Sequence, residues 1–481
     1  IVHVVMLTAQ TLECPFMHIH ILGICGTFMG GVAALAREAG HRVTGCDAGV
    51  YPPMSDQLRD LGIELIEGYD SDQLKLKPDC FVVGNVVSRA RTPQGQPRYP
   101  LMEAVLDAGA AYASGPEWLG QHILRQTDRA CHVLAVAGTH GKTTTTSMLT
   151  VAFQSLGLDP SFAIGGSIAR GGTNAHFGSG NYFVAEADES DGSFLAYKPH
   201  GAVVTNIELD HVDNFPNIEA ILDLFENFVA SIKSGGFLVI CIDGENQRKL
   251  LDHVKRDDLT IISYGQSSAD LTYSHLYLKP TGAMARIVHG GKILGELETS
   301  VPGEHNLLNA LAVIGVGIAT NQPVSELMNG IKNFTGARRR FEIKGAINGI
   351  TVVDDYGHHP TEIEVTLKAA RNFIGEGRIF VIFQPHRYSR TATFVNEFAN
   401  SLRTADKVYL LEVYGAGENP IPGISSKLIA DQLENATFNP SMVEVIELVA
   451  EEAKPGDLIL TLGAGDVSSL GPAILESLNE I

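Results

Sequence analysis

The chain has 481 residues, of which 44% are hydrophobic and 19% are charged, as is typical of a folded globular protein. This length predicts about three domains. The 35 basic and 55 acidic residues give a formal net charge of −20, which argues against nucleic-acid and membrane-surface binding but leaves small anionic ligands possible. No apolar stretch reaches the roughly 20 residues needed to span a bilayer.

The six cysteines are scattered without CxxC spacing, which favours a reducing compartment and predicts a cytoplasmic location. Residues 1–16 lack both a basic segment and a small-residue cleavage site, so a signal peptide is not expected. We expect these residues to be a spurious extension or a poorly ordered tail before a natural start at Met17.

The first region has the order strand, glycine-rich turn, helix, strand, which predicts an α/β nucleotide-binding unit. Its turn contains Gly23, Gly26 and Gly30 with the spacing G-x-x-G-x-x-x-G rather than GxGxxG, and Asp47 ends the following strand. This pattern favours a diphosphate-binding turn and leaves a redox cofactor as an alternative. The prolines within residues 91–100 predict a loop.

Two further α/β units follow. The apolar runs CHVLAVAG, YFVAEAD, GAVVTNIE and GFLVICID alternate with helical segments, which predicts a mostly parallel sheet. After FTGARRRF come the similar runs GITVVDDYGHHP, RIFVIFQPHR, KVYLLEVYGAGE and DLILTLGAGD. Ligands of open α/β sheets bind at the carboxyl ends of the strands, where these runs carry their polar residues.

The strongest motif lies between an apolar strand and a helix, and consists of Gly138, Thr139, His140, Gly141, Lys142, Thr143 and Thr144. Its glycines let backbone N–H groups approach phosphate oxygens, and the helix N-terminus adds partial positive charge. Lys142 would reach the terminal phosphates and Thr143 would ligate Mg²⁺. Val136 stands where the usual pattern has its first glycine. A chance glycine-rich turn is the alternative, which the flanking strand and helix disfavour.

Two acidic segments each follow a strand candidate. Residues 186–191 (EADESD) can hold a hard cation that bridges nucleotide phosphates, and residues 206–211 (NIELDH) add His211 at another strand end. Alone, these segments would be read as a solvated acidic turn and an ordinary loop histidine. Beside a phosphate loop they predict a site for a nucleotide and Mg²⁺.

The third unit contributes arginines and histidines. Arg338, Arg339 and Arg340 could clamp a transferring phosphoryl group, although a charge triplet is more often a solvated face. The segment DDYGHHP does not match HExxH, so a catalytic zinc site is not supported. Arg387 and Arg390 lie three residues apart after a strand, which suits bidentate binding of a carboxylate.

Together these strings resemble the Mur ligase family of peptidoglycan precursor synthesis. The resemblance is carried by GTHGKTTT, EADESDGSFL, TNIELDH, GEHNLLNA, ARRRF, DDYGHHPTE, FQPHRYSRT and LEVYGAGENPIPG, and it covers the chain from Met17 to the end. It implies an α/β fold with a Rossmann-like domain over 17–130, a central P-loop ATPase-like domain over 131–333 and a Rossmann-like domain over 334–481. The loop around Pro93 to Pro100 departs from the family pattern.

The resemblance implies an ATP- and Mg²⁺-dependent ligase that activates the lactyl carboxylate of UDP-N-acetylmuramate as an acyl phosphate, which an amine then attacks. From about Gly165 onward the strings resemble the branch that uses L-alanine. The strings HIHILGICGTFMGG, YPPMS and SGPEWL resemble the branch that attaches a murein tripeptide. Because the third domain binds the acceptor, L-alanine is favoured, with the tripeptide as the alternative.

The family pattern also implies a role for particular residues. ATP would be held by Gly138 to Thr144 and by His305, Asn306 and Asn309. The Mg²⁺ ligands would be Thr143, Glu186 and His211, and the catalytic residues Lys142, Glu186, His211 and Arg339. Tyr356, His358, Arg387 and Arg390 would receive the amino acid, and Gly23, Gly26, Gly30 and Asp47 the uridine diphosphate.

Two other classes of function are weighed against this interpretation. A non-catalytic nucleotide-binding protein would be favoured if Lys142 or Glu186 were replaced, and both are present. A nicotinamide-dependent dehydrogenase would leave the phosphate loop without a use.

Overall fold

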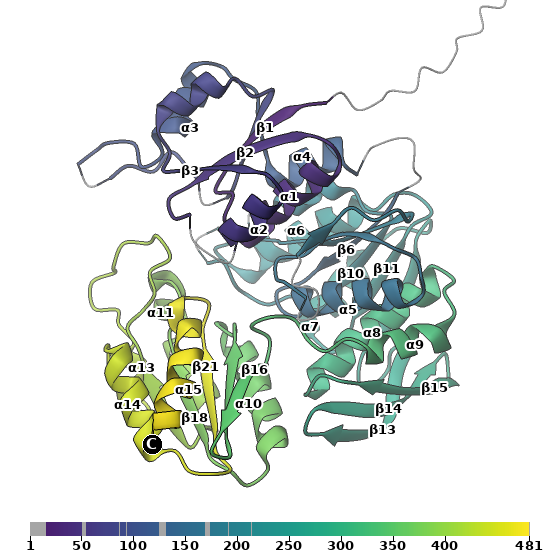
Figure 1. Ribbon diagram of the computed structural model, residues 1–481. Helices are drawn as coiled ribbons and strands as arrows, with labels where there is room; N and C mark the ends of the chain where they lie inside the picture. The colour runs from purple at the N-terminus through teal and green to yellow at the C-terminus, as the bar shows by residue number, and fades with distance from the viewer. Residues whose placement is uncertain are drawn as a thin grey trace, which may run out of the picture.

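The computed structural model describes residues 16–50, 54–85, 87–92, 94–124, 131–168, 174–190, 192–212 and 214–480. Within these ranges the strands form three separate sheets that follow one another along the chain (Figure 1). The expectation for residues 1–16 falls, except for Phe16, outside the described residues. No helix in the described part of the chain is long and apolar enough to cross a membrane.

The N-terminal sheet has the strand order β3-β2-β1-β4-β5, and every neighbouring pair is parallel. Its strands are β1 (His18–Leu22), β2 (Arg42–Asp47), β3 (Glu64–Glu67), β4 (Cys80–Val83) and β5 (Tyr112–Ser114). Its helices are α1 (Thr27–Glu38), α2 (Met54–Asp60), η1 (Ser71–Leu76), α3 (Pro100–Asp107) and α4 (Gly115–His122). Apolar residues of α1 and α4 cover one face and those of α3 the other, as a parallel sheet requires.

The expected loop at residues 91–100 is confirmed where the chain is described. Arg91 and Pro97 form an isolated bridge, and Pro100 begins α3, where a missing N–H costs nothing. Pro93 lies outside the described residues.

The central sheet has the order β15-β14-β13-β12-β11-β10-β6-β9-β7-β8. Its strands are β6 (His132–Ala137), β7 (Ser161–Ala163), β8 (Ala175–His176), β9 (Tyr182–Glu186), β10 (Gly201–Val204), β11 (Phe237–Cys241), β12 (Thr260–Tyr264), β13 (Leu271–Lys279), β14 (Gly282–His289) and β15 (Lys292–Thr299). Its helices are α5 (Lys142–Ser155), η2 (Ser193–Tyr197), α6 (Ile218–Ala230), α7 (Glu245–His253), α8 (Glu304–Ala319) and α9 (Val324–Lys332).

The expected parallel arrangement is confirmed from β7 through β9, β6, β10 and β11 to β12. The antiparallel strands β13, β14 and β15 extend the sheet and were not anticipated. Gly290 and Gly291, both at positive φ, form the turn between β14 and β15 and were the available signal. The buried side chains of α5, α8 and α9 pack on one face of the sheet, and Phe225 and Phe228 of α6 on the other.

The C-terminal sheet has the order β16-β17-β21-β18-β19-β20, in which the edge strand β16 alone is antiparallel to its neighbour. Its strands are β16 (Glu342–Ile347), β17 (Ile350–Asp355), β18 (Ile379–Phe383), β19 (Lys407–Leu410), β20 (Ala436–Phe438) and β21 (Leu458–Leu462). Its helices are α10 (Pro360–Ile374), α11 (Tyr388–Thr393), α12 (Val395–Leu402), α13 (Lys427–Ala430), α14 (Met442–Glu452), η3 (Asp466–Ser469) and α15 (Leu470–Glu480).

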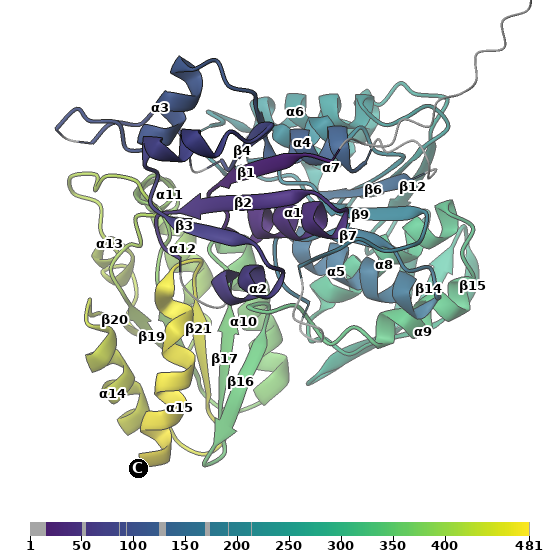
Figure 2. The ribbon, with the colours of Figure 1, turned by 45° about the horizontal axis from the view of Figure 1, so that its top comes forward.

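The three units touch one another. Figures 1 and 2 show the purple N-terminal sheet and the yellow-green C-terminal unit both lying against the teal central unit. The carboxyl ends of β10, β6 and β9 are neighbours, so the segments that follow these strands meet at one edge of the central sheet. The first residues of α10 also reach this edge, because Thr361 Oγ1 donates to Glu208 Oε2 at 2.6 Å.

Candidate functional site

The segment from Gly138 to Thr144 begins in the loop after β6 and ends in the first turn of α5, between a strand and a helix as predicted. Gly138 has a φ of 135°, and a Cβ there would lie 2.1 Å from Thr205 Oγ1, so a larger residue does not fit. Thr205 Oγ1 donates to the His140 carbonyl at 2.6 Å, and the His140 N–H donates to Asn206 Oδ1 at 2.7 Å. The loop is therefore bound to the end of the neighbouring strand β10.

Lys142 joins this loop to the segment after β9. Its Nζ donates to the Gly138 carbonyl at 2.6 Å and lies 2.9 Å from Glu189 Oε2. Burial lowers the pKa of Lys142, but Glu189 and Asp188 outweigh burial and raise it above its ordinary value. Lys142 is therefore a fixed positive charge. Glu189, its buried partner, received no role in the sequence analysis because the acidic segment does not show which carboxylate points inward.

Glu186, the last residue of β9, lies beside the loop hydroxyl. Thr143 Oγ1 donates to Glu186 Oε1 at 2.9 Å, and the Gly165 N–H donates to Glu186 Oε2 at 2.7 Å. Burial raises the pKa of Glu186, while Lys142 opposes this shift.

His211 contacts Glu189, with Nε2 3.7 Å from Oε1. Asp188, Glu189 and His211 present potential ligand atoms within 4.8 Å of one another. Hydroxyl and carboxylate oxygens at the end of a phosphate loop are the donors that Mg²⁺ prefers, so these residues fit that ion. The structure brings Thr143 and Glu186 into contact, as the predicted Mg²⁺ site requires, and it places His211 next to Glu189.

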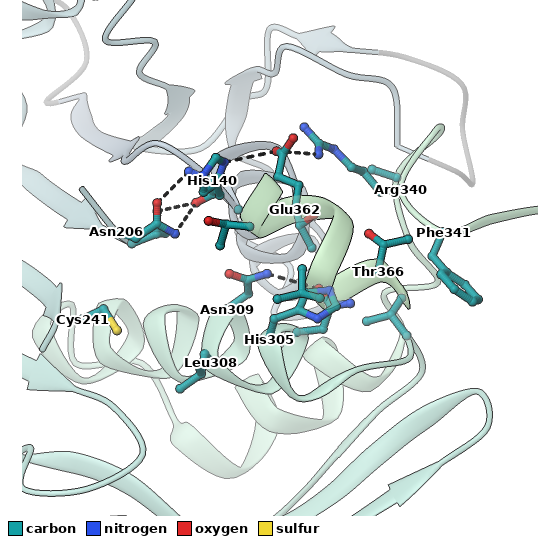
Figure 3. A pocket seen from close by; sticks show the side chains of 18 of the residues that line it. His140, Asn206, Cys241, His305, Leu308, Asn309, Arg340, Phe341, Glu362 and Thr366 are labelled. Carbon is teal, nitrogen blue, oxygen red and sulfur yellow. Dashed lines mark hydrogen bonds and ion pairs between the residues drawn. The ribbon is translucent and has the colours of Figure 1, made fainter. Parts of the chain in front are cut away.

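A cavity of about 290 Å³ adjoins the phosphate loop (Figure 3). His140, Gly141 and Thr144 line its loop end, and His305, Asn306 and Asn309 of α8 line it farther along. Burial lowers the pKa of His305 to about 4, so its ring is neutral near pH 7. The Asn309 amide donates to Asn306 Oδ1 at 3.1 Å. The cavity therefore combines a neutral ring and amide groups with a phosphate loop.

Arg340 rather than Arg339 lines this cavity. Arg340 Nη1 lies 3.3 Å from Glu362 Oε1, and Figure 3 shows both side chains at the cavity. Arg339 Nη2 instead donates to the Gly463 carbonyl at 2.7 Å, within the C-terminal unit. The sequence could not predict which of the two arginines faces the cavity, because the direction of each side chain depends on the local backbone conformation.

His140 bridges the central and C-terminal units. Its Nδ1 lies 3.3 Å from Glu362 Oε1 on α10, and its Nε2 lies 3.5 Å from Glu208 Oε2 after β10. Burial lowers the pKa of His140, but the two carboxylates outweigh burial and raise it to about 9. His140 lies in the phosphate loop, as predicted, and its side chain forms an interdomain ion pair.

The predicted acceptor residues lie at the ends of two strands that flank β21. Tyr356 and His358 follow β17, and their rings are 5.2 Å apart. Burial lowers the pKa of His358 to about 3, so its ring is neutral. Arg387 is half-buried at the start of α11, whereas Arg390 is buried with its Nη2 2.7 Å from Asp210 Oδ1. The two arginines thus differ in burial, and Arg390 forms an ion pair with Asp210.

The glycine turn after β1 is hydrogen-bonded to Asp47, the last residue of β2. The Cys25 N–H donates to Asp47 Oδ2 at 2.9 Å, and the Gly23 N–H donates to the Cys46 carbonyl at 2.8 Å. Gly26 precedes α1, and Gly30 within α1 lies against Met54. The turn after β1 is as expected, and its use for uridine diphosphate stays a prediction.

Family models match three consecutive parts of the chain. The model described as "Mur ligase family, catalytic domain" matches residues 18–127, "Mur ligase middle domain" matches 136–317, and "Mur ligase, glutamate ligase domain" matches 339–465. A UDP-N-acetylmuramate–L-alanine ligase of Mycobacterium marinum is 40% identical over 98% of this chain and 97% of its own length. The chain belongs to the Mur ligase family.

Solved structures of this family have the same architecture. The UDP-N-acetylmuramate–alanine ligase of Thermotoga maritima matches with a TM-score of 0.80 at 26% identity, covering 96% of this chain and 99% of that one. A murein peptide ligase of Psychrobacter arcticus matches with a TM-score of 0.72 at 30% identity, covering 97% and 99%. The three-domain α/β architecture is therefore confirmed, and the Mur ligase is an ATP-dependent enzyme that forms amide bonds.

We expect the stability that His140 confers to be lost as the pH rises through about 9. Its pKa is higher in the folded protein than the ordinary 6.5, so this stability is complete below pH 6.5. In thermal unfolding from pH 6 to 10, the midpoint temperature of His140→Asn should be well below that of the parent at pH 6.5. It should be close to that of the parent above pH 9. His275→Asn, at an exposed position of β13, is the control. A constant difference between parent and His140→Asn across this range would contradict the bridge.

Proposed function

We propose that this Mur ligase joins L-alanine to the lactyl carboxylate of UDP-N-acetylmuramate and consumes ATP. The observation that carries the proposal is the phosphate loop with Lys142 and Glu186, in a chain that matches an L-alanine ligase over 98% of its length. The proposed domain limits are 17–130, 131–333 and 334–481. A cytoplasmic location belongs to the proposal, and the free thiols of Cys25, Cys46, Cys80 and Cys241 support it.

The chemistry explains why ATP is needed. A carboxylate is a poor electrophile, and its oxygen is a poor leaving group. Transfer of the γ-phosphoryl group of ATP to the lactyl carboxylate gives an acyl phosphate and ADP. The neutral amine of L-alanine attacks the acyl carbon, and the tetrahedral intermediate collapses to the amide with loss of inorganic phosphate and a proton.

The central domain supplies the groups for phosphoryl transfer. Gly138 to Thr144 bind the phosphates through backbone N–H groups other than those of Thr139 and His140, which donate to Asn206. Lys142 places its charge at the γ-phosphoryl group. His305, Asn306 and Asn309 bind the adenosine in the cavity beside the loop. Thr143, Glu186 and His211 would hold Mg²⁺, which when bound neutralises charge on the phosphoryl oxygens.

The outer domains supply the other substrates. The glycine turn with Gly23, Gly26 and Gly30, together with Asp47 at the end of β2, holds the uridine diphosphate. Tyr356, His358 and Arg387 receive L-alanine at the ends of β17 and β18. Arg390 was predicted to act with Arg387, and its guanidinium already contacts Asp210.

A second acceptor is favoured by a specific observation. The chain is 30% identical to a murein peptide ligase over 97% of its length, and its N-terminal strings resemble that branch. Inorganic phosphate release with ATP, Mg²⁺ and UDP-N-acetylmuramate, measured with L-alanine or with the murein tripeptide, separates the two proposals. Faster release with the tripeptide would assign the chain to the recycling reaction.

Lys142→Ala should lower ligation by about 10²–10³-fold, because it removes a charged donor placed at the transferring group. The same change leaves the buried Glu189 without its counter-charge, so instability could imitate a catalytic loss. The double variant Lys142→Ala/Glu189→Gln removes that cost and should be folded and still inactive. Near-parental turnover in either folded variant would refute the assignment of the phosphate loop.

Glu186→Gln and His211→Ala should each require more Mg²⁺ for half-maximal ligation, because each removes one ligand of a hard cation. Mg²⁺ titrations at saturating ATP measure the change. Glu219→Gln, which alters a carboxylate in the first turn of α6, is the control. If both titration curves overlay that of the parent, these residues are not ligands.

Arg387→Lys should raise the KM for L-alanine much more than the KM for ATP. Lysine keeps the charge but loses the planar fork that binds a carboxylate through two hydrogen bonds. Initial rates with one substrate varied at a time give both constants. An unchanged KM for L-alanine would show that another residue binds the acceptor carboxylate.

A further inference from the structure

Asp210 and Arg390 form a buried ion pair across the boundary between the central and C-terminal domains. Asp210 lies in the loop after β10, Arg390 lies in α11, and each residue is 4% exposed. The Arg390 Nε and Nη2 atoms donate to Asp210 Oδ1 at 2.9 and 2.7 Å. Because a buried charge without a partner is costly, each of these side chains fixes the other.

Asp210 also holds the backbone of the next residue. The His211 N–H donates to Asp210 Oδ1 at 2.7 Å. His211 has a φ of 50°, a left-handed conformation that a residue other than glycine keeps only when its surroundings impose it. The direction of the His211 ring therefore depends on Asp210.

A continuous row of contacts leads from α11 to the phosphate loop. Arg390 contacts Asp210, which holds His211, and His211 Nε2 lies 3.7 Å from Glu189 Oε1. Glu189 in turn pairs with Lys142 Nζ at 2.9 Å. A displacement of α11 is thus passed to the residues around the γ-phosphoryl position through contacting side chains and the backbone N–H of His211.

The third guanidinium nitrogen of Arg390, Nη1, contacts a residue of its own domain. Arg390 Nη1 lies 3.3 Å from His386 Nδ1, and the His386 ring stacks on Tyr414. Arg390 Nη1 also donates to the His386 carbonyl at 3.5 Å. The guanidinium of Arg390 therefore forms four hydrogen bonds within the protein, out of its five N–H groups. Bidentate binding of a small carboxylate needs two N–H groups that are not already engaged.

We propose that the Asp210–Arg390 pair is an interdomain positioning device that orients His211 when the C-terminal domain docks. Arg390 acts through Asp210 rather than on the acceptor, and Arg387 is the arginine that meets the carboxylate of L-alanine. The inference rests on the proposed function in its assignment of His211 to the Mg²⁺ site.

Binding of Mn²⁺ in the presence of a non-hydrolysable ATP analogue, followed by electron paramagnetic resonance, tests this role without turnover. Asp210→Asn and Arg390→Gln should each weaken Mn²⁺ binding by about 10–100-fold, the usual effect of removing a group that orients a metal ligand. The double variant should bind Mn²⁺ about as well as the weaker single variant, because both changes break one unit.

The matched control is Arg378→Gln, which breaks an arginine–aspartate pair within the C-terminal domain. Arg378 Nη2 lies 2.6 Å from Asp457 Oδ2, so the pair has similar chemistry away from the domain boundary. We expect this variant to bind Mn²⁺ like the parent, although its thermal midpoint falls. Parental Mn²⁺ binding in folded Asp210→Asn would show that the interdomain pair is only a structural bond.

Arg390→Lys keeps the positive charge and serves if Asp210→Asn does not fold. It should weaken Mn²⁺ binding and lower kcat, while the KM for L-alanine stays near that of the parent. A raised KM for L-alanine with parental Mn²⁺ binding would make Arg390 an acceptor ligand and overturn the inference. Parental Mn²⁺ binding in His211→Ala would instead refute the proposed Mg²⁺ site.

Discussion

The attachment of the phosphate loop to the end of β10 is the constraint on which the rest of the site depends. Gly138 packs so tightly on Thr205 that no Cβ fits, and the Thr205 hydroxyl and Asn206 amide bind the backbone at His140. Because β6 lies between β10 and β9, this attachment brings the loop lysine and hydroxyl to the carboxylates that end β9. Backbone N–H groups are rigid donors only where the chain that carries them cannot move, so tight packing here suits the phosphate site that we propose for this loop.

Charge burial explains how the C-terminal domain is held against this edge. The boundary carries His140 between Glu208 and Glu362, and Arg390 on Asp210. Replacing such pairs by apolar side chains often costs little stability, so their value lies in specificity of docking. An ion pair is satisfied in one relative position of the domains, whereas an apolar contact tolerates sliding. These pairs therefore define a single docked arrangement. His140 is two residues before Lys142, and Asp210 directly precedes His211.

Local patterns predicted the parallel strands, the loop between β6 and α5, and the acidic segment after β9, because each depends on a short run of residues. The same patterns could not show that Arg340 rather than Arg339 lines the cavity, or that Glu189 faces Lys142. Those facts depend on backbone turns and on contacts between segments far apart in the chain. Arg390 is the clearest case, because its partner Asp210 is 180 residues away. Its spacing from Arg387 predicted that it binds the carboxylate of a substrate. In the structure, the carboxylate that it contacts is that of Asp210.

The division of the site among domains follows from the reactivity of an acyl phosphate. Such an intermediate is open to attack by water as well as by an amine, so the acceptor must arrive in a space that excludes water. In the proposed function, the phosphate-binding and metal-binding groups belong to the central domain, whereas the acceptor groups belong to the C-terminal domain. In our proposal, contacts through Asp210 connect His211 to Arg390. The residues for phosphoryl transfer are therefore correctly arranged only when the C-terminal domain, which binds the amine, is docked. Activation of the carboxylate is then confined to the arrangement in which the amine can use it.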